Sequence, residues 1–161
     1  MPARAQIRQI NQQMVTRILA DDASPLVEGS YALRVLHTRG RNSGEPRSTP
    51  VGVTLVAGRR YLVSPDTSRD WVRNLTAHPD CELLAGSGSQ QEEERFRAVP
   101  DDGATAAEVV ATYLSAMQVP WAIQAFPVSP GASRDEIAAH LDDIAVFRLD
   151  PDLTGPGSDG A

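Results

Sequence analysis

The chain has 161 residues, of which 41% are apolar and 22% are charged, as is ordinary for one globular domain that buries a core. Its net charge of −6 argues against a general nucleic-acid or anionic-membrane binder, and its single cysteine excludes an internal disulfide and a multi-cysteine metal site. All fifteen basic residues are arginine, so a lysine Schiff base and a catalytic lysine are excluded as well. No apolar run approaches the ~18 residues of a membrane span, and the N-terminus lacks a signal-peptide core, so we expect a cytoplasmic protein.

The first half of the chain is expected to form a helix followed by a β-meander. Apolar residues recur at helical spacing over residues 3–20, and strands are expected over residues 31–38, 49–56 and 60–64. Pro50 belongs at the edge or the start of the second strand, because proline cannot donate to a sheet. Gly52 lacks a side chain in the middle of that strand, which suits a flat ligand lying against the backbone, or a bulge.

The second half alternates helices with further strands. Ser68 is expected to be the N-cap of a short helix that Pro79 ends, and a longer helix begins at Asp101. Residues 120–131 form a proline-rich loop, Ser133 caps a short helix, and the remaining strands cover residues 80–85, 93–99 and 144–149. Six short strands in meander order predict a small closed or split barrel of the α+β class rather than a parallel sheet. We expect one domain over residues 1–150 and a disordered tail over residues 151–161.

The turn between the first two strands is the candidate binding element. The turn contains arginines, glycines, short side chains with hydroxyl groups and a single acidic residue: Arg39, Gly40, Arg41, Ser43, Gly44, Glu45, Arg47, Ser48 and Thr49. Guanidinium groups and exposed backbone N–H groups bind phosphates and carboxylates. The turn therefore predicts an anion clamp, with an ordinary solvated turn as the alternative. It is neither a P-loop nor a dinucleotide fingerprint, because the required spacings are missing.

The sequence presents no obvious catalytic side chain. His37, His78 and His140 are far apart, so we expect no metal site, and no Gly-x-Ser-x-Gly elbow is present. A binding clamp without an acid, base or nucleophile points to a reaction whose chemistry belongs to a bound redox cofactor. The catalytic residues stay unassigned at this point.

Two motifs resemble a known family. Residues 40–50, Gly-Arg-Asn-Ser-Gly-Glu-Pro-Arg-Ser-Thr-Pro, resemble the Gly-Arg-Lys-Ser-Gly-x-x-Arg-x-Thr-Pro signature of the deazaflavin-dependent nitroreductases, which are F420-dependent oxidoreductases of actinobacteria. Residues 71–79, Trp-Val-Arg-Asn-Leu-Thr-Ala-His-Pro, are similar to that family's Trp-x-x-Asn-Leu-x-Ala-Asn-Pro run. The order of the expected elements also agrees over roughly residues 1–151.

The resemblance implies a fold, a cofactor and a reaction. The fold is a split β-barrel of about six mostly antiparallel strands, similar to FMN-binding barrels, with reduced coenzyme F420 in a groove. The clamp arginines would hold the phosphate and acidic tail, the backbone of residues 50–52 would lie against the ring, and the segment from Ser64 to Arg69 would border it. The implied cofactor residues are Arg41, Asn42, Ser43, Arg47, Thr49, Pro50, Val51, Gly52, Ser64, Trp71 and Asn74. The reaction is hydride transfer to a small organic acceptor such as a quinone, an enone or a nitroaromatic compound.

This chain departs from the family pattern at positions that affect function. Asn42 replaces the signature lysine, which removes one positive charge from the clamp, and His78 replaces an asparagine. Quinone-reducing members carry tyrosines over the substrate where this chain has Trp121 and Phe126, so we expect a bulkier or more apolar substrate there.

Several alternatives therefore stay open. One is a split barrel that has lost the redox reaction and binds or shapes a small-molecule pathway intermediate. Another is the same barrel with FMN or haem in place of F420. A homodimer is also open, because split barrels often pair through a sheet face. The substrate in every case is a small molecule rather than a nucleic acid.

Overall fold

The computed structural model describes residues 4–21, 24–85 and 92–152 of the chain. Six strands and five helices lie within these ranges: α1 (Arg4–Ala20), β1 (Tyr31–Arg39), β2 (Pro46–Val56), β3 (Arg59–Ser64), α2 (Asp70–Ala77), β4 (Asp80–Ala85), β5 (Glu92–Pro100), α3 (Ala104–Ala116), α4 (Pro120–Gln124), α5 (Arg134–Ala138) and β6 (Ala145–Pro151). No helix in these ranges is long and apolar enough to cross a membrane.

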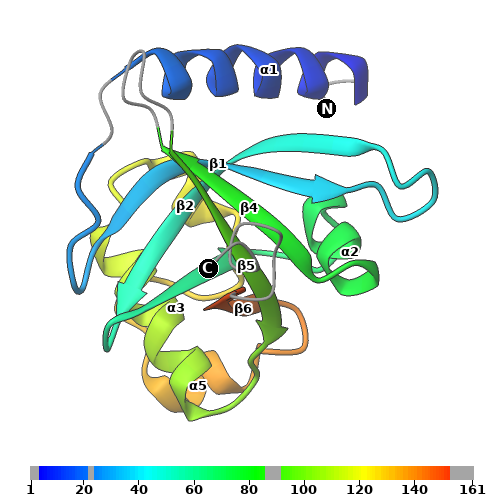
Figure 1. Cartoon of the computed structure of the whole chain (residues 1–161). Coiled ribbons are helices and arrows are strands. Elements are labelled where there is room, and N and C mark those ends of the chain that lie inside the picture. The colour runs from blue at the N-terminus through cyan, green and yellow to red at the C-terminus, as the bar shows by residue number, and fades with distance from the viewer. Residues whose placement is uncertain (1–3, 22–23, 86–91, 153–161) are drawn as a thin grey trace.

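The strands form a closed barrel in the order β1-β2-β3-β6-β5-β4, and all neighbouring strands are antiparallel (Figure 1). The β1–β2 hairpin pairs along the whole of β1, from Tyr31 to Arg39. The barrel closes through a much shorter ladder between β1 and β4, which spans only residues 35–37 of β1. The prediction of a six-stranded, mostly antiparallel barrel is therefore confirmed.

The alternation of side chains along β2 separates two cores. Val51 and Val53 point into the barrel, where they join a buried cluster that includes Leu62 and Phe96. Successive strand residues point to opposite faces, so Gly52 and the residues two positions before and after it lie on the outer face of the sheet. β2 thus presents one face to the interior and the other to the helices that cover the barrel.

Helices cover the barrel on several sides. α3 and α5 contact each other and form a second buried cluster with the outer faces of β3 and β6, in which Val109, Val110 and Ile137 are fully buried. α1 lies across the other side of the barrel, against β1, β2 and β4 (Figure 1). α2 places Trp71 and Leu75 in the barrel core, and the Trp71 ring lies 6.1 Å from that of Phe147. One face of α2 is therefore fixed by apolar packing against the barrel core.

Four local predictions need correction. α3 begins at Ala104, after Gly103 as its N-cap, rather than at Asp101. β2 begins at Pro46 rather than at residue 49, because the hairpin ladder continues to Arg39. Arg69 is the N-cap of α2, without a side-chain hydrogen bond, since the Ser68 hydroxyl donates instead to Asp66 Oδ1 at 2.6 Å. The expected loop over residues 120–131 contains α4, whose Pro120 suits the first helical turn.

One further local prediction is confirmed, and another falls mostly outside the described residues. The Ser133 Oγ accepts a hydrogen bond from the Glu136 N–H at 3.1 Å, which confirms it as the cap of α5. Pro151 ends β6, whereas residues 153–161 of the predicted tail lie outside the described residues.

Candidate cofactor site

The hairpin turn between β1 and β2 is closed by its own backbone. The Gly40 N–H donates to the Glu45 carbonyl and the Gly44 N–H donates to the Gly40 carbonyl, both at 2.8 Å. Gly44 has a φ of +72°, a conformation that glycine adopts without strain. A Cβ at Gly40 would lie 2.8 Å from Ser43 Oγ and 3.4 Å from Arg47 Nε. Glycine at this position therefore lets the turn fold tightly and brings the Arg47 guanidinium next to its backbone.

Arg41 connects this turn to α2. Its backbone N–H and its Nη1 both donate to Asn74 Oδ1, at 3.1 and 3.0 Å, and its Nη2 lies 3.3 Å from Asp70 Oδ1. The Arg41 side chain is 24% exposed, and Asn74 is buried. Two residues that the motifs singled out separately, Arg41 and Asn74, are thus in direct contact, and they fix the turn against the helix.

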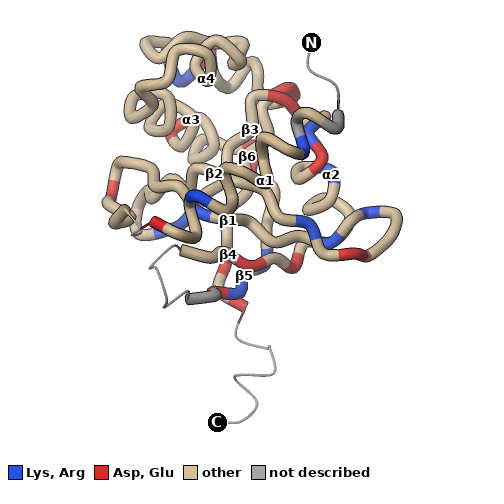
Figure 2. Tube along the Cα trace, turned by 90° about the horizontal axis from the view of Figure 1, so that it is seen from above, with Lys and Arg blue, Asp and Glu red and all other residues tan. Residues whose placement is uncertain are grey.

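Arg47 differs from Arg41 because its charge is available. It is exposed, and no ion pair joins it to an acidic side chain in the described ranges. Asn42 is also exposed, while the Ser43 hydroxyl accepts the Glu45 N–H at 3.1 Å and so shapes the turn itself. Figure 2 shows basic residues along this hairpin where it extends beyond the barrel beside α2. Arg39, at the end of β1, is likewise exposed and has no ion pair in these ranges, so the hairpin offers two free guanidinium groups beside Arg41, which is held in place.

The strand that leaves the turn has an open edge. β2 pairs with β3 only from Val53 to Val56, so Pro50 lies where β2 has β1 as its sheet neighbour. Pro50 therefore interrupts no ladder, in agreement with the prediction for it. Thr49 and Pro50 are half-buried, and Val51 is buried in the barrel core. This edge lies between the hairpin turn and the outer face at Gly52.

Two tyrosines that the sequence analysis missed cover Gly52. A Cβ at Gly52 would lie 3.0 Å from Tyr31 Cδ2 and 3.4 Å from Tyr113 Cε2. The two tyrosine rings are 5.7 Å apart, and the Tyr113 ring is also 5.7 Å from that of Phe126. The Tyr31 hydroxyl donates a long hydrogen bond, of 3.6 Å, to the Met117 sulfur. The glycine that we expected to admit a flat ligand is therefore in contact with an aromatic cluster of Tyr31, Tyr113 and Phe126.

The Tyr113 phenol has an unusual environment. Burial, together with the neighbouring Tyr31, raises the pKa of Tyr113 to about 12, and Arg69 opposes this shift by lowering the pKa. The Arg69 Nε itself lies 3.7 Å from Asp66 Oδ2, with which it forms an exposed ion pair. Arg69 directly precedes α2, and the next residue, Asp70, contacts Arg41. The start of α2 thus contacts the hairpin turn through Asp70.

The other predicted residues take different positions. Ser64 is fully buried, and its hydroxyl donates to the Asp66 carbonyl at 2.6 Å, so it shapes the segment that leads to α2. Trp71 is buried in the barrel core. Of the two predicted substrate residues, Phe126 joins the aromatic cluster, whereas Trp121 is 71% exposed on α4. The structure thus places Phe126 against Tyr113, which contacts Gly52 of the predicted cofactor strand, and leaves Trp121 on the surface.

A cavity of about 610 Å³ lies on the neighbouring side of α2. Arg41 is the residue that it shares with the predicted cofactor set. Apolar and charged residues both line it, and the lining consists of Arg41, Thr67, Val72, Arg73, Thr76, Ala77, Pro100, Asp101, Asp102, Leu141, Ile144, Ala145, Val146 and Phe147. Within the described ranges, no group of three or more histidine, cysteine, aspartate or glutamate side chains could hold a metal ion.

Solved structures share this fold at low sequence identity. A heme-binding protein from Mycobacterium smegmatis has 19% identity and a TM-score of 0.50, over 75% of this chain and 46% of that protein. A Listeria innocua protein provisionally described as a pyridoxamine 5′-phosphate oxidase has 14% identity and a TM-score of 0.52, over 74% and 83% of the two chains. A nimC/nimA family protein from Clostridium acetobutylicum has 18% identity and a TM-score of 0.50, over 88% and 82%. At these identities the likeness supports the split-barrel fold alone.

Sequence comparison adds the family. No curated protein sequence matches this chain. The model of one family matches residues 6–116, a segment that contains the hairpin turn, α2 and α3 up to Ala116. The family is one of oxidoreductases, and its cofactor is coenzyme F420. The chain belongs to the F420H(2)-dependent quinone reductase family.

Proposed function

We propose that this protein transfers a hydride from reduced F420 to a small conjugated electrophile of the quinone, enone or nitroaromatic type. The observation that carries the proposal is the hairpin turn, where an exposed Arg47 without an ion pair in the described ranges lies beside an Arg41 that α2 holds in place. F420 carries a phosphodiester and a carboxylate tail, and guanidinium groups bind such anions through charge-assisted hydrogen bonds.

The residues of the turn fit an anionic cofactor in their chemistry. Arg47 would bind the phosphate or a tail carboxylate directly, because no protein group competes for it in the described ranges. Arg41 would contribute charge from a fixed position, while Asn42 would donate hydrogen bonds without charge. The half-buried edge at Thr49 and Pro50 continues from the turn and would take the flat ring. The aromatic cluster next to it would receive the acceptor.

The chain's own contribution to the reaction is position and electrostatics. When bound, reduced F420 supplies the hydride. The turn holds the anionic end of the cofactor, and the strand edge at Pro50 fixes one face of the site. The aromatic cluster provides an apolar surface that excludes water from a planar acceptor. A bulky apolar acceptor suits this surface, as the sequence of the 120–131 segment predicts.

The alternative is a barrel that binds a small molecule without redox chemistry, and the cavity beside α2 favours it. A molecule in that cavity would contact the apolar residues Val72, Ile144 and Phe147, which lie outside the predicted cofactor set. The two functions therefore place their ligand on different sides of α2.

One variant separates the two placements. Ala77 is exposed, lines the cavity and ends α2, so Ala77→Trp would fill the cavity with little effect on the hairpin turn. The experiment follows oxidation of reduced F420 by quinones, enones and nitroaromatics in the wild type and in Ala77→Trp. The proposal predicts turnover with at least one acceptor class and an F420 affinity within about twofold of wild type in the variant. No turnover with any acceptor, or loss of F420 binding in Ala77→Trp, would contradict it.

A further inference from the structure

We propose that the cavity beside α2 is a second ligand site, which binds a small zwitterion whose opposite charges are separated by an apolar body, as in a short apolar peptide. The inference goes beyond the proposed hydride transfer and does not require it. Arg41 is the one residue that belongs both to this cavity and to the predicted cofactor set.

The cavity has the size and the apolar surface of a small-molecule site. Its volume of about 610 Å³ lies within the ~300–1,000 Å³ of cavities that enclose small ligands. Val72 and Phe147 in its lining belong to the barrel core, and Ile144 belongs to the second buried cluster beneath α3 and α5. These three side chains are buried, so the packing of both cores fixes the apolar part of the cavity before any ligand binds.

The positive charge of the lining comes from the hairpin turn and α2. The Arg41 guanidinium is already bound to Asn74 and Asp70. Arg73 also lines the cavity, is exposed, and forms no ion pair in the described ranges. Arg73 is therefore the guanidinium that is available to a ligand carboxylate.

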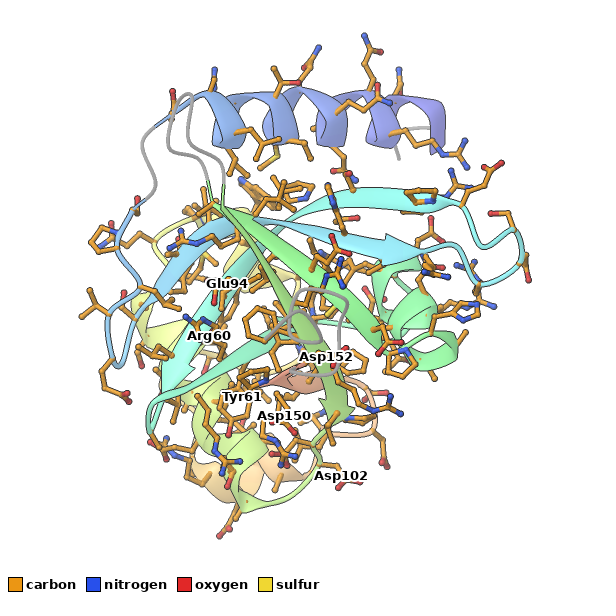
Figure 3. All side chains as sticks on the ribbon, viewed as in Figure 1. Arg60, Tyr61, Glu94, Asp102, Asp150 and Asp152 are labelled. Carbon is orange, nitrogen blue, oxygen red and sulfur yellow. The ribbon has the colours of Figure 1, made fainter. Side chains whose placement is uncertain are left out.

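The negative charge of the lining comes from the segment that follows β5. Asp101 Oδ1 accepts a hydrogen bond from the Gly103 N–H at 3.1 Å, which holds that side chain in the turn. Figure 3 shows Asp102 on the connection between β5 and α3. Asp102 lines the cavity, is exposed, and has no ion pair in the part of the chain that the structure describes. Its carboxylate is therefore available to an ammonium group.

The two free charges define the class of ligand. Arg73 and Asp102 line the same cavity and form no ion pair with each other, so they are separated from one another. A ligand with a single charge would match one of them and be repelled by the other, whereas a zwitterion matches both. An extended dipeptide separates its terminal charges by roughly 7 Å, and apolar side chains between them would contact the buried residues of the lining.

The test compares four forms of one dipeptide, phenylalanyl-leucine, by titration calorimetry. The free dipeptide carries both charges, the N-acetyl form only the carboxylate, the amide form only the ammonium, and the N-acetyl amide neither. All four have the same apolar side chains, so differences in affinity among them report the charges. The free dipeptide should bind with a Kd below about 1 mM, and loss of either charge should weaken binding by about 3- to 5-fold.

Two exposed residues assign each charge to its partner. Arg73→Gln should weaken binding of the two forms that carry a carboxylate by about 3- to 5-fold and leave the amide form unchanged. Asp102→Asn should weaken the two forms that carry an ammonium and leave the N-acetyl form unchanged. Arg17→Gln is the control for net charge, because Arg17 is exposed on α1 and does not line the cavity, and it should behave as wild type.

The cavity itself is tested with Ala77→Trp, which should abolish binding of all four forms while the thermal melt stays cooperative. Several results would overturn the inference: no binding of the free dipeptide by the wild type, equal affinity for the free dipeptide and the neutral form, or affinities that are the same in Arg73→Gln, Asp102→Asn and wild type. The two charge variants keep the test decisive if Ala77→Trp does not fold, since both residues are exposed.

Titration in the presence of saturating F420 separates this inference from the proposed function. The dipeptide should bind with a Kd within about twofold of its value without F420, because the two ligands lie on different sides of α2. Displacement of the dipeptide by F420 would place it in the cofactor site and overturn the inference, with hydride transfer intact. Charge-dependent dipeptide binding in a protein that does not bind F420 would instead remove the proposed reaction and support the second site.

Discussion

Arg47→Ala tests the anion clamp directly. Arg47 is exposed and has no ion pair in the described ranges, so its removal breaks no interaction that stabilises the fold. Arg41 is less suitable, because its guanidinium also joins the turn to Asn74 and Asp70. A loss of affinity in Arg47→Ala would therefore report the contact with the cofactor alone.

The magnitude follows from the chemistry of the contact. A hydrogen bond between charged groups contributes about 1.5–3 kcal/mol, and exposure of Arg47 to water favours the lower half of this range. Because each 1.4 kcal/mol is a tenfold change, the Kd for F420 should rise by about 10- to 50-fold. The affinity of the wild type should also weaken with added salt, and the variant should show a smaller salt dependence.

The assay is a fluorescence titration with oxidised F420 at two salt concentrations. Arg59→Ala is the control for net charge, since Arg59 is exposed and begins β3, beyond the far end of β2. The 11 residues of β2 place that end about 35 Å from the turn. Equal affinity in Arg47→Ala and wild type would refute the clamp, and an equal loss in both variants would show that only the total charge matters.

Two further predictions concern the rest of the site and the core. Asn74→Ala should lower the free energy of unfolding by about 1–3 kcal/mol, because the buried Asn74 Oδ1 accepts two hydrogen bonds from Arg41; a thermal melt equal to that of wild type would contradict this. Cys81 should resist thiol reagents in the folded protein up to pH values near its pKa of about 12, which burial raises, and should react at once in denaturant. Rapid labelling of the native protein at pH 8 would show that Cys81 is accessible.

The barrel and the turn were predictable from the sequence for local reasons. Alternating apolar residues such as Val51 and Val53 specify strands with one buried face, and their short connections specify antiparallel neighbours. The turn could be predicted because several glycines and arginines lie within a few positions of one another in the sequence. These signals are contained within one or two elements, so no knowledge of the closed barrel is needed to read them.

The aromatic cluster was not predictable in the same way. Tyr31 begins β1 and Tyr113 lies near the end of α3, and they meet only because both contact the outer face of β2 at Gly52. Tyr113 and Tyr31 are 82 positions apart in the chain, so no local pattern indicates that they meet. The missing side chain of Gly52 was the available signal, since a glycine inside a strand indicates close approach by another group.

Local competition explains the smaller errors. Ser68 has the right chemistry for an N-cap, but Asp66 takes its hydroxyl two residues earlier, and α2 begins at Asp70. Pro120 was interpreted as a loop residue because residues 120–131 are rich in proline, although proline is also favoured in the first turn of a helix. In each case the residue suits two local structures, and its contacts in the folded protein decide which one forms.

Parallel titrations of the purified wild type with oxidised F420 and with FMN test the central claim most directly. The account predicts saturable binding of F420 in the micromolar range or tighter, weakened in Arg47→Ala, with much weaker binding of FMN. Binding of FMN in preference to F420, or of neither, would contradict a clamp for the acidic tail and would direct attention to a small-molecule ligand in the cavity beside α2.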